Sequence, residues 1–315
     1  MITIDDIKSA RPNVYKHLNP TPLYHYSGLS ELVGAEVWVK HENHQPVGAF
    51  KVRGGLNLVA NLSEDEKKAG LYTASSGNHG QSIAYASRAY GTKATIAVPE
   101  GANPEKIALM KGMGAEVLTH GADFDSAREW IMGIAEEKGG IFVSPTDEKL
   151  ICGVGTYALE IFDELPEVDY IIVPVGAGSG ACGTSIVAHS LNPTVKVIGV
   201  QSKLAPTMQM SWKSGEQLSG EMNTSVEGIA TRVSFENTQQ IMRKYLSDFL
   251  LVSDESIYDA LRLMIQHTHN MPEGAGAAPL AAALTMKERL EGKKVVLIMS
   301  GGNISLQRLK SVLGD

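Results

Sequence analysis

NHQPVGAFKVRGG, residues 43–55, joins a strand-like stretch to a helix-like one and holds Lys51 at the junction. Residues 37–40 alternate as a strand does, a proline stops that strand, and Gly48 permits a tight turn. We therefore expect a helix to begin near Phe50, with the amine of Lys51 at an exposed bend. The positive end of a helix dipole disfavours an ammonium ion, so this position predicts a lowered pKa and a neutral, nucleophilic amine. Taken alone, the segment fits an ordinary surface lysine better.

Length and composition indicate the class of protein. A chain of 315 residues exceeds what one hydrophobic core usually spans, and 43% of it is hydrophobic, so we expect two folded lobes. Acids and bases are mixed along the chain, with a net charge of −7, which argues against nucleic acid or an anionic membrane as the main partner. We expect neither a secretory leader nor a membrane span. Cys152 and Cys182 form no paired motif, which favours a cytoplasmic protein, and a small molecule fits best as its ligand.

Buried strands and helices alternate along the chain. Continuous apolar runs indicate buried strands at residues 94–98, 170–175, 195–200 and 295–299. Helical patterning occupies residues 82–90, 104–113, 123–137, 184–190 and 255–269. This alternation is typical of parallel sheets covered by helices. We therefore predict an α/β fold of two lobes, each a mostly parallel sheet flanked by helices. Because no linker composition separates the lobes, we expect one to be folded into the other.

A glycine-rich loop, GAGSGACG at residues 176–183, follows a predicted strand and opens a predicted helix. Its bare N–H groups and the positive end of the helix dipole suit an anion such as a phosphate. Gly178, Gly180 and Gly183 also match the G-x-G-x-x-G of dinucleotide sites, but Gln201 stands where such a site expects an acid. A nicotinamide oxidoreductase is therefore the weaker interpretation. The alternative is a glycine-rich turn that only permits close packing, but it does not explain why the loop has so many glycines.

Two further polar loops follow apolar strands. Residues 75–81, SSGNHGQ, offer hydroxyls, an amide and free N–H groups suited to a carboxylate, although a serine N-cap alone also explains them. Residues 300–303, SGGN, form the third loop. Because ligands bind at the carboxyl ends of strands in open α/β sheets, we expect the three loops to meet at one site. A lysine, a phosphate cradle, a carboxylate-binding loop and a polar loop are together what a pyridoxal phosphate enzyme acting on an amino acid needs.

The chain resembles the fold-type-II pyridoxal phosphate enzymes, whose fold is like that of the tryptophan synthase β subunit. It is most similar to the serine/threonine dehydratases and serine racemases, over nearly its whole length. The motifs that carry the resemblance occur in order at residues 43–55, 75–81, 176–183 and 300–303. The resemblance implies a large cofactor-binding domain of residues 1–66 and 148–315 and a small substrate-side domain of residues 67–147. It also implies a homodimer, and β-elimination from L-threonine or L-serine to a 2-oxo acid and ammonia.

The resemblance gives each site residue an implied role. Lys51 forms the Schiff base with the cofactor and, once freed by the substrate amine, removes the α-proton. The residues implied to bind the cofactor are Phe50, Lys51, Asn78, Gly176, Ala177, Gly178, Ser179, Gly180, Glu273 and Ser300. The residues implied to bind the substrate are Ser75, Ser76, Asn78, His79 and Thr146. Ser300 faces the pyridine nitrogen, where a neutral hydroxyl makes the ring a weaker electron sink than a carboxylate does and favours prompt elimination.

Two positions leave the reaction and its substrate open. Ser76 matches the serine that returns a proton from the opposite ring face in racemases, so serine racemisation remains an alternative or secondary activity. Thr146 stands where relatives often place a large aromatic residue, which leaves room for 3-hydroxyaspartate or another 3-hydroxy amino acid. Residues 273–277 resemble the catabolic threonine dehydratases, which favours the dehydratase. A binding protein without catalysis would have no need of Lys51.

No metal site is expected. Some relatives bind a divalent cation through acidic side chains at positions that are Gln201 and Thr207 here, and hard cations prefer charged oxygen ligands. The histidine pairs at His41 and His44 and at residues 267–269 have no third ligand at zinc-like spacing.

Overall fold

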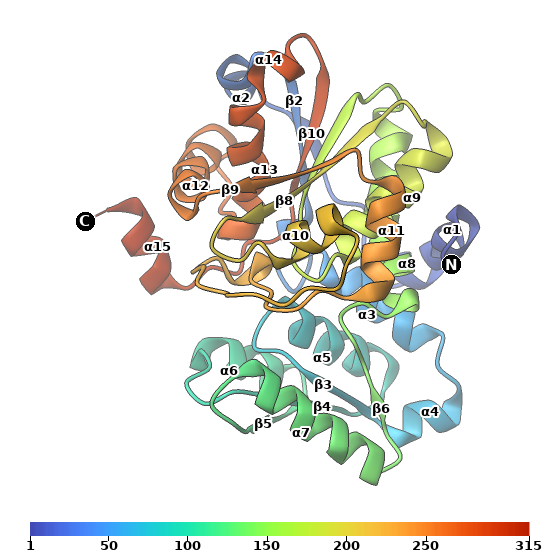
Figure 1. Ribbon diagram of the computed structural model, residues 1–315. Helices are drawn as coiled ribbons and strands as arrows, with labels where there is room; N and C mark the ends of the chain where they lie inside the picture. The colour runs from blue at the N-terminus through green and yellow to red at the C-terminus, as the bar shows by residue number, and fades with distance from the viewer. Residues whose placement is uncertain (315) are drawn as a thin grey trace.

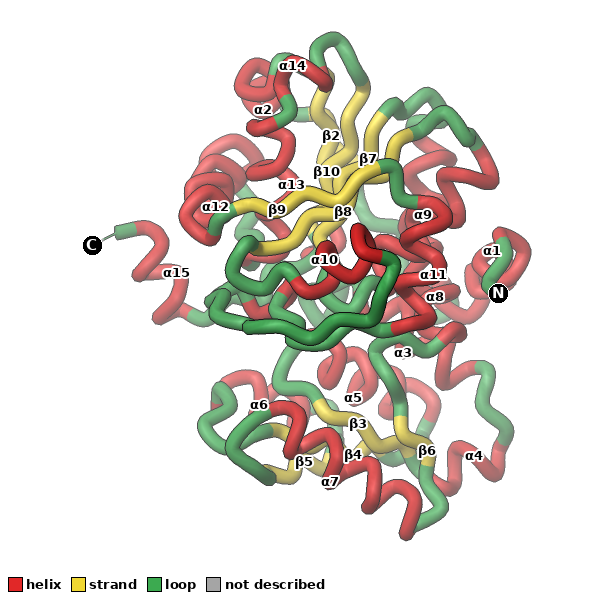
Figure 2. Tube along the Cα trace, in the orientation of Figure 1, coloured by secondary structure: helices red, strands yellow, loops and turns green. Residues whose placement is uncertain are grey.

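The computed structural model describes residues 1–314, which form two separate sheets within two lobes (Figure 1; Figure 2). Over these residues the larger sheet has the strand order β1-β2-β10-β7-β8-β9 and the smaller sheet the order β5-β4-β3-β6. The larger sheet consists of β1 (Leu23–His25), β2 (Glu36–His41), β10 (Lys294–Met299), β7 (Tyr170–Pro174), β8 (Lys196–Ser202) and β9 (Asp248–Val252). The smaller sheet consists of β5 (Glu116–Thr119), β4 (Ala94–Val98), β3 (Leu71–Ala74) and β6 (Ile141–Phe142). All these neighbours are parallel except β1 and β2, which confirms the predicted α/β class.

Helices cover both sheets. The helices of the first half are α1 (Ile4–Tyr15), α2 (Ser27–Val33), η1 (Glu42–His44), α3 (Lys51–Ala60), α4 (Glu64–Ala69), α5 (Asn78–Tyr90), α6 (Pro104–Gly112), α7 (Phe124–Glu137) and α8 (Glu148–Glu164). Those of the second half are α9 (Ser179–Leu191), α10 (Thr207–Ser214), η2 (Glu227–Ile229), α11 (Glu236–Tyr245), α12 (Asp254–Thr268), α13 (Gly274–Thr285), α14 (Lys287–Leu290) and α15 (Leu306–Leu313). No helix among the described residues is long and apolar enough to cross a membrane.

The predicted elements exist, but two helices start earlier than the apolar pattern indicated. The predicted strand at 94–98 is β4 with those bounds, and the other predicted strands differ from β7, β8 and β10 by one or two residues at an end. α5 begins at Asn78 and α9 at Ser179, because both polar loops turn directly into helix. The smaller sheet lies within residues 71–142, inside the range predicted for the small domain, and the domain boundaries themselves stay a prediction.

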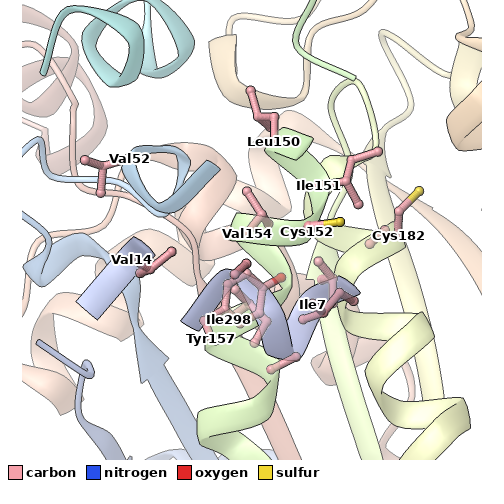
Figure 3. Close-up of a cluster of buried hydrophobic side chains, with 14 of the residues drawn as sticks. Ile7, Val14, Val52, Leu150, Ile151, Cys152, Val154, Tyr157, Cys182 and Ile298 are labelled. Atoms are coloured by element: carbon pink, nitrogen blue, oxygen red, sulfur yellow. The ribbon is translucent and has the colours of Figure 1, made fainter. Parts of the chain in front are cut away.

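The central position of β10 explains why the sequence of this strand is apolar without alternation. It lies between β2 and β7, and both of its faces are covered. Val296 and Ile298 pack in the core that includes α1, α3, α8 and α9, whereas Val295, Leu297 and Met299 pack in the core that includes α2, α12 and α13. Figure 3 shows part of the first core, with Ile7, Val14, Val52, Leu150, Ile151, Cys152, Val154, Tyr157, Cys182 and Ile298.

Glycines let α3 lie unusually close to its neighbours. A Cβ atom on Gly54 would stand 2.6 Å from the Leu150 side chain in α8, and one on Gly55 would stand 2.4 Å from the Ser82 hydroxyl in α5. Gly153 of α8 allows the same close approach from the other side, since a Cβ there would stand 2.3 Å from the Arg53 carbonyl. The Gly54-Gly55 pair thus places the start of α3 against helices of both lobes.

Four buried charges hold α3 in place. The guanidinium of Arg53 donates to Glu42 at 2.7 and 2.9 Å and to Glu160 at 2.6 and 3.0 Å. The ammonium of Lys40 lies 2.6 Å from Glu160 and donates to the Thr21 carbonyl at 2.6 Å. Two cations therefore balance two carboxylates, and none of the four side chains is more than 3% exposed. The cluster joins β2, η1, α3 and α8.

We expect Glu160→Gln to lower the free energy of unfolding by about 3–5 kcal/mol, because it leaves a buried cation without its full counter-charge. Asp163→Asn, one turn further along α8, removes an exposed ion pair with Arg11 and should change stability by about 1 kcal/mol or less. Urea unfolding of both variants provides the comparison. Equal losses would contradict the interpretation of the cluster.

Candidate active site

The turn before Lys51 is fixed to the loop that follows β10. The Phe50 N–H donates to the Ser300 carbonyl at 3.0 Å, and the Gly302 N–H donates to the Gly48 carbonyl at 2.9 Å. Gly48 has φ +66°, a conformation that favours glycine. The helix predicted near Phe50 begins at Lys51, so two segments far apart in sequence are joined at Gly48 and Phe50, immediately before the first residue of α3.

The amine of Lys51 lies between the two lobes. It donates to the Ser179 hydroxyl at 2.7 Å and approaches the Pro145 carbonyl at 3.4 Å. The predicted exposed bend is therefore wrong, because packing of the second lobe encloses the end of the side chain. Burial lowers the pKa of Lys51 to about 8. The direction agrees with the sequence prediction, but the main cause is burial rather than the helix dipole.

The loop at 176–180 forms a cradle of free N–H groups at the start of α9. None of the N–H groups of residues 176–181 donates to another described residue. Gly178 has φ +101°, and a Cβ on Gly176 would stand 2.6 Å from the Gly228 carbonyl. Ser179 accepts from Lys51 and keeps its own hydroxyl hydrogen free. The cradle thus fits a phosphate group, and it lies beside the amine of Lys51.

Aromatic packing limits the space between the lysine and the cradle. The ring of Phe50 meets that of Tyr157 edge-on, with centroids 6.1 Å apart. The Tyr157 hydroxyl donates to the Gly180 carbonyl at 3.1 Å, which ties α8 to the cradle. Ser300 is buried and uses its carbonyl to hold Phe50. Sequence reasoning missed Tyr157, because it lies in the middle of a helix with no motif around it.

Asn78 links the small lobe to two loops of the large lobe. Its Nδ2 donates to the Glu273 carboxylate at 2.8 Å, and its Oδ1 accepts from Asn303 at 2.8 Å. Burial raises the pKa of Glu273 to about 6. Glu273 precedes α13, and its own N–H donates to the Gly301 carbonyl at 2.9 Å. The sequence identified the loop that carries Asn303 but not the amide itself as part of the site.

The loop between β3 and α5 places the predicted substrate-binding residues near Asn78. Ser75 accepts from the Gly77 N–H at 3.1 Å, and Ser76 is half-buried beside it. α5 has no serine N-cap, since its N-cap is Gly77. The His79 ring lies 3.0 Å from the Thr73 hydroxyl and 3.3 Å from the Val143 carbonyl, and burial lowers the pKa of His79 to about 3. His79 can therefore offer its backbone N–H to a carboxylate but not a charged ring.

The segment after β6 brings Thr146 to the same region. Thr146 is buried, its hydroxyl lies 3.0 Å from that of Ser144, and its carbonyl accepts from Asn237 at 2.5 Å. The preceding carbonyl is the one near Lys51. An ion pair between Lys106 and Glu227 further joins α6 of the small lobe to η2 of the large lobe. The sequence carried no signal for the contacts of Thr146 with Asn237, of Lys51 with Pro145 and of Lys106 with Glu227, because each of these joins residues about 90 or more positions apart.

Gln201 uses its amide within the protein. Its Nε2 donates to the Thr231 hydroxyl at 2.9 Å, and its Oε1 accepts from the Gln209 N–H at 3.2 Å. Thr207 is buried at the start of α10.

Known proteins are similar to this chain over most of its length. Residues 14–301 match the family model described as pyridoxal-phosphate dependent enzyme. The chain is 40% identical to the L-threonine ammonia-lyase of Thermotoga maritima over 99% of its own length and 78% of that protein. It is 35% identical to the catabolic L-threonine dehydratase TdcB of Escherichia coli, over 99% and 96%. The crystal structure of the Dictyostelium discoideum serine racemase superposes with a TM-score of 0.91 at 35% identity, covering 97% of this chain and 99% of that one.

We expect Lys51, in protein free of cofactor, to react with an acylating reagent with a pH midpoint near 8, because only the neutral amine attacks and its pKa is about 8. Competitive labelling followed by mass spectrometry of the Lys51 peptide measures the midpoint. The same peptide labelled in denaturant is the control, with an expected midpoint near the ordinary lysine value of about 10.4. Equal midpoints in the two states would show that folding leaves the amine unperturbed.

Proposed function

This chain belongs to the family of pyridoxal-phosphate dependent enzymes, and from that membership we propose that it converts L-threonine, or L-serine, to a 2-oxo acid and ammonia by β-elimination. The observation that carries the proposal is the 2.7 Å contact between the Lys51 amine and Ser179 at the mouth of the N–H cradle. That contact places a nucleophilic amine directly beside an anion-binding loop. The names of these two relatives, L-threonine ammonia-lyase and L-threonine dehydratase, favour threonine over serine as the substrate.

The residues divide the work between binding and proton transfer. When bound, pyridoxal 5'-phosphate supplies the electron-withdrawing ring that weakens the bonds at the α-carbon. The N–H groups of residues 176–181 would hold its phosphate, and Phe50 and Ser300 would hold its ring. Lys51 would hold the cofactor through its amine, and its Nζ is the atom that would take the α-proton of the substrate. Burial lowers the pKa of Lys51, which favours the neutral amine that can act as a base.

The loop before α5 orients the amino acid. The N–H groups of Asn78, His79 and Gly80 open α5 and have no acceptor within that helix, so they are suited to the substrate carboxylate. Ser75 and Ser76 add hydroxyls at the same loop. Thr146, beside the carbonyl that Lys51 approaches, borders the substrate side chain. Contacts between the two lobes at Asn78 would limit the access of water to the reacting carbon.

Racemisation of serine is a second candidate activity. Ser76 lies in the loop that precedes α5, and a serine racemase is among the solved structures that superpose on this chain. A second proton donor on the opposite face of the substrate is what racemisation needs.

We further propose that the enzyme works in the cytoplasm as a homodimer on free amino acids, and that nucleic acid is not a partner. Cys152 and Cys182 are free and buried, which fits a reducing compartment.

We expect the purified protein with its cofactor to release 2-oxo acid from L-threonine faster than from L-serine or the 3-hydroxyaspartate stereoisomers. Lys51→Ala should lower kcat/KM by about 10³-fold or more, because it removes both the attachment point and the base. Lys68→Ala, an exposed lysine of α4, is the control and should leave the rate unchanged. A Lys51→Ala variant that retains activity, or a wild type that releases no 2-oxo acid, would overturn the proposed function.

Ser76→Ala separates the two candidate activities. We expect it to lower formation of D-serine from L-serine by about 100-fold or more, because the second proton donor is lost, while 2-oxo acid release stays within a few-fold of wild type. Chiral chromatography and a 2-oxo acid assay on the same reaction give both rates. Equal losses of the two products would instead place Ser76 in the elimination pathway.

A further inference from the structure

The side chain of Asn303 joins three loops at a single point. Its Nδ2 donates to the Val47 carbonyl at 2.8 Å and to the Oδ1 of Asn78 at 2.8 Å. An amide nitrogen carries two hydrogens, so both are used. Val47 lies in the turn that leads to Lys51, and Asn78 is the first residue of α5 in the small lobe. Asn303 itself follows β10.

The direction of these hydrogen bonds is fixed at both ends. A backbone carbonyl can only accept, so the NH₂ group of Asn303 must face Val47. The same NH₂ group then requires the oxygen of the Asn78 amide on its other side. The NH₂ group of Asn78 is thereby turned toward the carboxylate of Glu273, which accepts one hydrogen at 2.8 Å. A flipped Asn78 would set donor against donor at Asn303 and acceptor against ionised acceptor at Glu273.

The second hydrogen of the Asn78 amide has no acceptor among the described residues, since the Nδ2 of Asn78 donates a hydrogen bond only to Glu273. A nitrogen held in one orientation, with one hydrogen committed and one free, is a preset donor. In the proposed function Asn78 would hold the ring hydroxyl of the cofactor, whose oxygen can accept this hydrogen. The orientation of that donor depends on Asn303, which does not itself need to touch the cofactor.

The turn before Lys51 is shaped to admit the Asn303 amide. A Cβ on Gly48 would stand 2.7 Å from the Oδ1 of Asn303, and Gly48 has φ +66°. Glycine is thus required at this position both by the backbone conformation and by the space that the amide occupies. The backbone bond from Gly302 to Gly48 keeps the two loops in register.

We propose that Asn303 is a positioning residue, whose amide sets the orientation of the Asn78 amide and so presents its free hydrogen to the ring hydroxyl of the bound cofactor. This inference rests on the proposed function. It assigns to the chain's third polar loop a role that differs from cofactor contact through Ser300. The alternative is a purely structural role, in which Asn303 only connects the turn to α5. The experiment must distinguish this role from the positioning role.

The test is Asn303→Asp, which keeps the shape of the side chain but replaces the two donor hydrogens by acceptor oxygen. The matched control is Asn61→Asp. Asn61 makes the same kind of pair at the end of α3, since its Nδ2 donates to the Asn57 carbonyl at 2.7 Å and to the Asn57 Oδ1 at 3.1 Å. Titration of cofactor-free protein gives the dissociation constant of pyridoxal 5'-phosphate, and the absorbance spectrum of the loaded protein gives the environment of its ring.

We expect Asn303→Asp to raise the cofactor dissociation constant about tenfold and to shift the visible absorbance band, because a hydrogen bond to the ring oxygen is lost or misdirected. Asn61→Asp should leave both unchanged. If Asn303 acts through Asn78, the effect of Asn303→Asp on the dissociation constant should disappear in an Asn78→Ala background. A wild-type constant and band in Asn303→Asp, or an undiminished effect in that background, would overturn the inference.

A second variant and the behaviour of the wild type distinguish failure of the positioning role from failure of the proposed function. If Asn303→Asp does not fold, Asn303→Ala removes the donors without adding charge, and the same expectations apply to it. If the wild type binds no cofactor, the proposed function fails as a whole. If the wild type binds cofactor and releases 2-oxo acid while both Asn303 variants behave as wild type, only the positioning role fails.

Discussion

The position of Lys51 depends on the buried ion cluster around Arg53, two residues further along α3. Glu42 stands just before the turn at 43–50 and Arg53 just after it, so their ion pair closes the two ends of that turn. Glu160 and Lys40 complete the balance of charge from α8 and β2. Burying four charges is expensive, and a helix start shifted by one residue would leave at least one of them unpaired. Pairing within the cluster therefore favours this one position for the start of α3.

Burial acts on the pKa values of Lys51 and Glu273 with opposite signs. It lowers the pKa of Lys51 to about 8 and raises that of Glu273 to about 6, because the charged form of each group is disfavoured away from water. The same enclosure thus brings the pKa values of this amine and this carboxyl group, which lie far apart in water, closer together. The enclosure comes from the meeting of the two lobes at Lys51, Asn78 and Thr146.

Much of the fold was predictable because its signals are local. The strand at 94–98 and the strands β7, β8 and β10 are continuous apolar runs, since parallel strands are covered on both faces. The helix starts at Asn78 and Ser179 were placed too late, because apolar periodicity begins only after the polar first turn. The exposed bend expected at Lys51 was wrong for a different reason. Exposure depends on what packs against the turn, and here Ser179 and Pro145 come from distant parts of the chain.

The sequence by itself determined the alternation of strands and helices, the polar loops at the ends of strands, and the resemblance that led to the cofactor. These depend on turn residues, periodicity and short motifs, which act over a few positions. Only the tertiary structure decided which atoms of those loops meet. The donor order from Asn303 through Asn78 to Glu273 spans residues more than 190 positions apart, and the balance of charge at Arg53 spans more than 100. Hydrogen-bond direction and burial are properties of that packed arrangement, so no local pattern in the chain encodes them.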